Sequence, residues 1–244
     1  MSPAAVRTSG LKKSYGTVHA LQGVDLEVMS GEVFGIVGPN GAGKTTTIDC
    51  IAGMRVRDSG EVSVLGMDPG KTGDELRRRI GLQQQESELP ERIRVKEALE
   101  LFSSLYGTRV ETSRLLSMVG LTRKEQSYFS ALSGGQKKRL FVALAMVHDP
   151  ELVILDELTS GLDPAGRRQL WSMVREFRNT SKTVILSTHY MDEAEELCDR
   201  VAIISEGRVI AVDTPEALIE RYCPGMILKL GCGDDFQAEK ALSV

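Results

Sequence analysis

Residues 38–46, Gly-Pro-Asn-Gly-Ala-Gly-Lys-Thr-Thr, fit the pattern G-x-x-x-x-G-K-[ST]. In this pattern the glycines let backbone N–H groups close around phosphate oxygens, and the helix that follows adds positive charge. Lys44 is placed to reach the β and γ phosphates of a nucleotide, and Thr45 to bind Mg²⁺. A tight strand-to-helix turn with an exposed lysine is the alternative. We predict a phosphate loop made of Gly38, Pro39, Asn40, Gly41, Ala42, Gly43, Lys44, Thr45 and Thr46.

A second turn of similar composition lies in the other half of the chain. Ser133-Gly134-Gly135-Gln136 is polar and flexible, and a helical pattern follows at once. Such a turn can also hold an anion. One phosphate loop is enough for one nucleotide, so the ligand of this second turn is an open question at this point.

Two adjacent carboxylates, Asp156 and Glu157, follow the apolar run Val153–Leu155. Asp156 suits a Mg²⁺ ion, bound directly or through water. Glu157 can orient or deprotonate a water that attacks a γ-phosphate. On its own an Asp-Glu pair after a strand is usually a helix cap or a surface charge. The phosphate loop upstream favours the catalytic interpretation.

Polar residues follow two further predicted strands. His189 comes after 183–188, and one of three consecutive glutamines, Gln83 to Gln85, comes after 79–83. Ligands of parallel sheets gather at the carboxyl ends of the strands, so we expect four strand ends to meet at one nucleotide. Tyr15 is a candidate for stacking on a base, and a packed surface tyrosine is the equal alternative.

Alternating strand and helix patterns must position these groups. Strands are predicted at 32–38, 79–83, 151–156, 182–188 and 200–205, several of them continuously apolar, as in a parallel sheet covered on both faces. Helices are predicted from Lys44 and over 165–179 and 191–200. This order is typical of an α/β fold.

Two regions differ from this pattern. Residues 6–30 and 60–66 alternate polar and apolar, as small antiparallel strands do, and residues 91–148 read as helices only. In the last helix Leu140, Ala143, Leu144 and Val147 form one apolar face. A helical block therefore interrupts the α/β core.

Bulk properties narrow the class of protein. The chain has 244 residues and a net charge of −4, which argues against a dedicated nucleic-acid binder. We see neither an apolar run of about 20 residues nor a signal peptide. The four cysteines show no paired spacing, which is typical of free thiols in the cytosol. We therefore predict a cytoplasmic protein without nucleic-acid partners.

Taken in order, "GPNGAGKTT", "LSGGQ", "VILDE", "SGLD" and "STH" make the chain resemble the ATP-binding subunits of ABC transporters, over residues 6 to about 222. Residues 162–218 look most like multidrug, lipid or polysaccharide exporter subunits. The resemblance implies a P-loop NTPase (RecA-like) core in 1–85 and 150–222, with a small antiparallel β part. It also implies an inserted all-helical subdomain at 86–149, and a tail at 223–244 that begins an accessory domain.

The resemblance also answers the question of the second turn. In this family two subunits face each other head to tail, so Ser133, Gly134, Gly135 and Gln136 would contact the ATP held by the other subunit. It implies base stacking for Tyr15, a cross-interface role for Asp163, and Mg²⁺ and water contacts for Gln85. Glu157, His189 and Gln85 are the implied catalytic set, and Thr45, Gln85 and Asp156 the implied Mg²⁺ ligands.

Two positions depart from or blur the family pattern. Proline usually follows the Asp-Glu pair, and here Leu158 stands in its place, which predicts a less rigid turn. The three glutamines are ambiguous, and the family spacing after "IG" selects Gln85.

The resemblance implies an ATP-hydrolysing exporter motor with Mg²⁺ and ATP as cofactors. Its partners would be a second copy or a similar subunit, and a separate transmembrane permease that holds it at the cytosolic face of the membrane. The alternative is an ABC-type ATPase in DNA repair or translation. The first kind carries long coiled coils and the second carries two cassettes per chain, and neither is visible here.

Overall fold

A computed structural model describes residues 3–109, 111–180 and 182–223. Within them the chain forms a three-stranded sheet of order β2-β1-β4 and a six-stranded sheet of order β5-β6-β7-β3-β8-β9. The strands are β1 (Ala4–Tyr15), β2 (Val18–Met29), β3 (Val33–Val37), β4 (Ser59–Val64), β5 (Ile80–Gln83), β6 (Leu152–Asp156), β7 (Thr183–Thr188), β8 (Arg200–Ser205) and β9 (Arg208–Asp213). The α/β prediction is confirmed.

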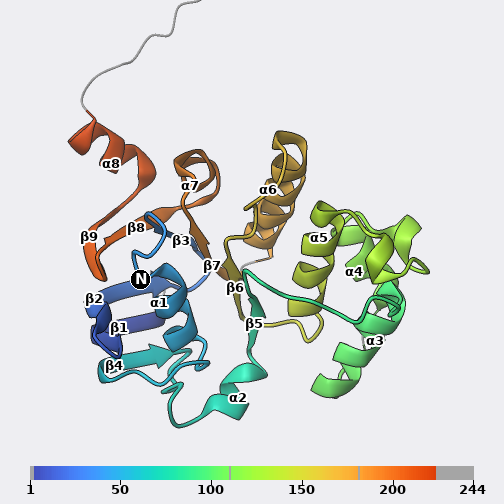
Figure 1. Cartoon of the computed structure of the whole chain (residues 1–244), viewed down its shortest axis with the longest axis horizontal. Helices are drawn as coiled ribbons and strands as arrows, with labels where there is room; N and C mark the ends of the chain where they lie inside the picture. Colours follow the sequence, from blue (N-terminus) through green and yellow to red (C-terminus); the bar gives the residue numbers. More distant parts are fainter. Residues whose placement is uncertain (1–2, 110, 181, 224–244) are drawn as a thin grey trace, which may run out of the picture.

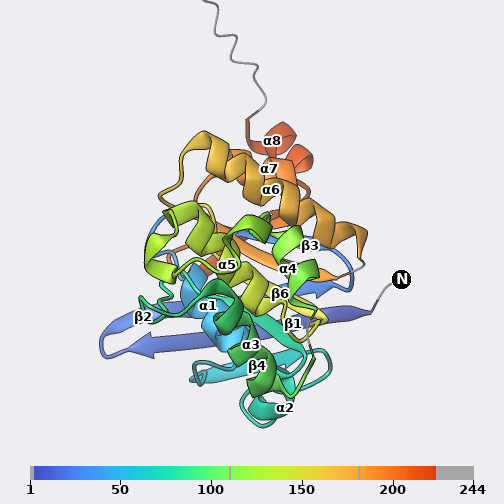
Figure 2. The same cartoon turned by 90° about the vertical axis from the view of Figure 1, so that its right-hand side faces the viewer.

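The helices fall into three groups in space. Helices α3 (Val95–Tyr106), α4 (Thr112–Met118) and α5 (Gly134–Ala145) gather on one side of the molecule, at the right in Figure 1. Helices α6 (Pro164–Asn179), α7 (Met191–Leu197) and α8 (Pro215–Tyr222) lie at the end opposite the small sheet, as Figures 1 and 2 both show. Helices α1 (Lys44–Ile51) and α2 (Gly73–Arg77) complete the set.

The large sheet is parallel from β5 to β8, and β9 is an antiparallel edge strand. Our sequence analysis did not anticipate β9 or α8. Residues of β9 alternate between exposed and half-buried, so the strand lacks the continuous apolar run that marked the others. The parallel order brings the carboxyl ends of β3, β5, β6 and β7 to one edge.

Alternation along the buried strands divides the interior into two cores. On one face Val37, Leu155 and Leu186 pack with α3–α7, and on the other Ile36, Ile154 and Ile185 pack with α1 and the small sheet. Strands β3, β6 and β7 are buried at every position, because both faces are covered. The predicted parallel sheet between two layers is thus confirmed.

The helical block packs on one of these cores through the face that the sequence predicted. Leu140, Ala143, Leu144 and Val147 are each at most 4% exposed. Burial of one large apolar side chain contributes about 1.5–3 kcal/mol, so this face anchors α5 to the sheet. The predicted division at residues 86–149 stays a prediction, and the tail at 224–244, with its expected strand and helix, lies outside the described residues.

Candidate nucleotide-binding site

The loop between β3 and α1 closes tightly because two of its glycines have no room for a side chain. A Cβ on Gly38 would lie 2.2 Å from the Ile204 carbonyl oxygen, and one on Gly43 would lie 2.7 Å from the Ala20 carbonyl oxygen. Gly43 also has a φ of 107°, and it precedes α1 without a side-chain cap. The N–H groups of the first helical turn, which have no partner inside the helix, are therefore left for a ligand.

Lys44 at the start of α1 is 4% exposed. Its Nζ lies 2.9 Å from the Gly38 carbonyl oxygen, 3.1 Å from that of Pro39 and 3.3 Å from Glu157 Oε1. A buried ammonium requires such partners, because desolvating an unpaired charge is costly. The contacts hold Lys44 across the loop, between the phosphate-binding backbone and the carboxylate at the end of β6.

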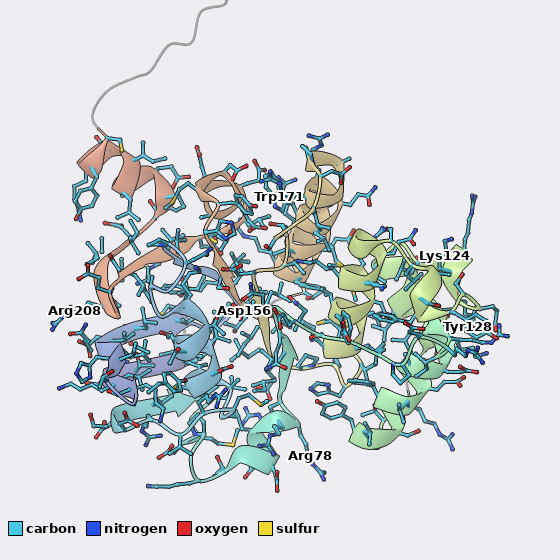
Figure 3. The ribbon with its side chains drawn as sticks, in the orientation of Figure 1. Arg78, Lys124, Tyr128, Asp156, Trp171 and Arg208 are labelled. Carbon is cyan, nitrogen blue, oxygen red and sulfur yellow. The ribbon has the colours of Figure 1, made fainter. Side chains whose placement is uncertain are left out.

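Asp156 is the last residue of β6 and is 2% exposed. Burial raises the pKa of this carboxyl, while hydrogen bonds donated to its Oδ1 by Ser187 and Thr45 act the other way. The Thr45 Oγ1–Asp156 Oδ1 distance is 3.5 Å. Figure 3 shows Asp156 in the middle of the view, where the core and the helical block meet.

Glu157 follows with a φ of 47°, a left-handed conformation that is uncommon for a residue with a side chain. Its N–H donates to Ser187 Oγ at 3.0 Å. Its Oε2 accepts a hydrogen bond from Gln85 Nε2 at 3.2 Å, and His189 Nδ1 lies 3.6 Å from its Oε1. The expected meeting of four strand ends is therefore seen around this carboxylate.

The three glutamines separate clearly in the structure. Gln85 contacts Glu157 and lines the cleft over the phosphate loop, whereas Gln83 and Gln84 line a second groove on the other side of β5. Gln83 is buried at the end of the strand. The geometry agrees with the choice of Gln85.

The cleft has a volume of about 690 Å³. Tyr15 lies at its mouth with 42% of its surface exposed, so an aromatic face is available to a base. The loop contributes Asn40, Gly41, Gly43, Lys44, Thr45 and Thr46, and Gln85 and Glu157 lie opposite. Asp156 and His189 contact these residues without lining the cleft themselves.

Several residues of the cleft were missed by sequence reasoning. Val18, His19, Ala20 and Gln22 come from β2, and Glu206 and Gly207 come from the β8–β9 turn. Both turn residues have positive φ, as a two-residue hairpin requires. The Glu206-Gly207 pair before a polar residue was the available signal for the hairpin, but nothing local places it beside the phosphate loop.

The Ser133–Gln136 turn does not line this cleft. It begins α5 as a capping box, in which Ser133 Oγ accepts from the Gln136 N–H at 3.3 Å and Gln136 Oε1 accepts from the Ser133 N–H at 3.0 Å. Asp163 is also exposed and caps α6 through the Gly166 N–H at 2.9 Å. Neither feature contacts its own chain's phosphate loop residues among the hydrogen bonds of the described part.

Comparison with known proteins agrees with this geometry. The family model described as ABC transporter matches residues 21–160. The chain belongs to the ABC transporter family. Its ATP-binding domains are ATPases, so the predicted ATP-hydrolysing subunit and the P-loop fold are confirmed. Subunits of this kind dimerise and work with membrane permease components. No helix in the described ranges is long and apolar enough to cross a membrane.

Two curated relatives carry export or resistance names. The chain is 38% identical to the Nod factor export ATP-binding protein I of Rhizobium sp. (strain N33), over 96% of this chain and 79% of that one. It is 36% identical to the linearmycin resistance ATP-binding protein LnrL of Bacillus subtilis (strain 168), over 92% and 74%. A solved ATP-binding subunit of an ABC transporter matches with a TM-score of 0.79 and 29% identity, over 90% and 93%.

Proposed function

We propose that this chain is the ATP-hydrolysing subunit of an exporter and drives a separate membrane subunit. The observation that carries the proposal is the cleft in which Lys44, Glu157 and Gln85 converge from three strand ends. The export names of the relatives support the direction of transport. Each site residue then has a role that its contacts make reasonable.

Binding is the work of the loop and Tyr15. The N–H groups at the start of α1 and the Lys44 ammonium hold the phosphates, since both carry positive charge to the same place. Tyr15 stacks on the adenine at the mouth of the cleft. Within the site a phosphate takes over the Lys44 contact with Glu157, which frees that carboxylate to accept a proton from water.

Glu157 is the general base for the attacking water, and Gln85 and His189 orient the carboxylate and the water. Gln85 already donates to Oε2 at 3.2 Å, and His189 lies on the other side of Oε1. A base held on two sides delivers its oxygen in one direction, which is how positioning lowers a barrier.

The residues present fit a Mg²⁺ ion. The described residues hold no group of three His, Cys, Asp or Glu, so a protein-only metal cage is not formed there. Mg²⁺ in nucleotide sites is held instead by one or two oxygens and the phosphates. Thr45 Oγ1 and Asp156 Oδ1 lie 3.5 Å apart, and Gln85 is close by. These three would hold the ion, which would neutralise phosphate charge.

The exposed Ser133–Gln136 turn completes the site of a second subunit. Two copies, or this chain and a similar one, pair head to tail on ATP, so that each turn meets the γ-phosphate on the other chain's loop. Such a contact closes into a two-fold dimer because each subunit supplies both halves. Asp163, beside the turn after β6, faces the same interface.

The permease docks in a groove of about 430 Å³ beside Gln85. Its wall combines apolar and charged groups, among them Leu82, Leu89, Phe102, Tyr106, Glu86 and Glu88. An amphipathic helix of the membrane subunit matches this mixture. Docking there places the chain on the cytosolic face of the membrane and links the permease to the strand end that carries Gln85.

Phosphate release by the purified protein tests the proposal. With Glu157→Gln we expect the rate to fall on the order of 10²–10⁴-fold, as loss of a positioned base does, while ATP still binds. Lys44→Ala should lose both binding and hydrolysis. Near-wild-type rates in both variants would refute the assignment of this cleft.

A further inference from the structure

Lys138 joins the helical block to the turn that carries Glu157. It lies on α5, five residues after Ser133, and its Nζ is 3.2 Å from the Glu157 carbonyl oxygen and 2.7 Å from the Ser160 carbonyl oxygen. The side chain is half-buried, and burial lowers the pKa of its ammonium. One side chain thus spans the boundary between two layers that are separated by 19 and 22 residues in sequence.

The turn that Lys138 contacts holds an unfavourable backbone conformation. A left-handed φ at a residue with a Cβ costs about 1–2 kcal/mol, and Glu157 adopts it at 47°. Its N–H is fixed on one side by Ser187 of β7. Its carbonyl oxygen accepts from the Ser160 N–H at 3.2 Å and from Lys138 on the other side.

Residue 158 cannot supply the missing rigidity. Leu158 is 3% exposed and packs in the core, but its φ is not locked by a ring as that of a proline would be. The restraint on the carbonyl side of Glu157 therefore comes from outside the turn. A charged donor to two carbonyl oxygens is a strong restraint, since hydrogen bonds to charged groups exceed neutral ones.

We propose that Lys138 is a positioning residue that sets the direction of the Glu157 carboxylate by fixing its carbonyl oxygen. The inference rests on the proposed role of Glu157 as the base. Because α5 also begins with the Ser133–Gln136 turn, Lys138 ties the orientation of that turn to the orientation of the glutamate of the same chain. Binding at the turn and base positioning are thereby mechanically linked.

The experiment compares Lys138→Met with Lys138→Arg and with a matched control, Lys137→Met. Lys137 is the neighbouring lysine on the same helix, and it lies over the Phe129 ring at 4.5 Å rather than on the turn. Rates of phosphate release, KM for ATP, affinity for a fluorescent ATP analogue and melting temperature are measured for each. Glu157→Gln is measured alongside.

With Lys138→Met we expect kcat to fall about 10- to 100-fold, the cost of a misplaced catalytic group, while affinity for the analogue stays that of the wild type. Lys138→Arg should recover most of the rate, because a guanidinium can donate to both oxygens, and Lys137→Met should be unaffected. A melting temperature near that of the wild type separates this effect from a loss of folding.

Three results would overturn the inference. The first is a wild-type kcat in Lys138→Met while Glu157→Gln is inactive, which leaves the proposed function intact. The second is an equal fall in kcat and nucleotide affinity, which indicates general damage. The third is a Lys138→Arg variant as slow as Lys138→Met. An active Glu157→Gln would overturn both the base assignment and the tether.

Discussion

Two helices of this chain begin in the manner of an anion site, and they are finished differently. Helix α1 begins behind Gly43 with no side-chain cap, and residues from β2, β6 and the β8–β9 turn enclose its first turn. Helix α5 begins behind Ser133 with a complete capping box, and its first turn is largely exposed. The first is a site built by one chain, and the second has one wall only.

The difference separates two tasks. Groups that bind ATP lie together around α1, so one chain suffices for binding. The turn before α5 contributes nothing to that cleft, so its contribution to the reaction must come through another molecule. A substitution at α1 should therefore affect binding, and one at α5 should affect only the steps that need two chains.

The largest expected contrast comes from Gly134→Asp set against Lys44→Ala. A Cβ on Gly134 meets nothing within 4 Å, and an acidic residue in the first helical turn is favourable, so the variant should fold. Its carboxylate would oppose a phosphate, and hydrolysis should fall on the order of 10²-fold, as when one charge-stabilising donor is lost. ATP binding should survive, unlike in Lys44→Ala. Equilibrium binding and phosphate release, measured together, test the contrast.

A weaker effect is expected at the groove beside Gln85. Glu86→Lys and Ser87→Trp change its charge and its space, and neither residue is in the ATP cleft. In the transporter reconstituted with its permease, coupled transport and partner binding should fall while the ATPase rate of the isolated chain stays unchanged. Survival of both partner binding and transport in the two variants would place docking elsewhere.

The smallest effect is on stability, at Asp156. Burial raises the pKa of this carboxyl, so its ionised form lowers the free energy of unfolding at pH values above the ordinary aspartate pKa. Asp156→Asn keeps an acceptor for Ser187 and removes the charge. The melting temperature at neutral pH should rise by about 2–4 °C, which corresponds to about 1 kcal/mol in a protein of this size.

The gain from Asp156→Asn should shrink as the pH falls toward about 4, because the wild-type carboxyl is then neutral in both folded and unfolded chains. Hydrolysis should be lost in the same variant. A melting temperature below that of the wild type at neutral pH would show that the carboxylate stabilises the fold.

The sequence predicted the parts of the site that local pattern controls. A phosphate loop is specified by residues within one turn, so Gly38 to Thr46 could be placed without the fold. Asp156 and His189 were placed because continuous apolar strands end just before them. Ser133 to Gln136 were assigned a ligand through family resemblance, since no local rule says which chain they face.

The parts that were missed are contacts between segments far apart in the sequence. Gly207 approaches Ala20 closely, and Lys138 reaches Glu157 from another layer, and no spacing rule connects either pair. Strand β9 escaped notice because an edge strand with one solvent side has no apolar run. Such features depend on how layers pack, which periodicity within one element does not determine.

The central claim is that the Ser133–Gln136 turn of one chain completes the ATP site of another. Sedimentation of Glu157→Gln, which holds ATP without hydrolysing it, tests this with and without ATP and beside the double variant Gly134→Asp/Glu157→Gln. We predict a dimer for Glu157→Gln with ATP, a monomer without it, and a monomer for the double variant in both conditions. A Glu157→Gln protein that stays monomeric at saturating ATP, or a double variant that dimerises equally well, would contradict the claim.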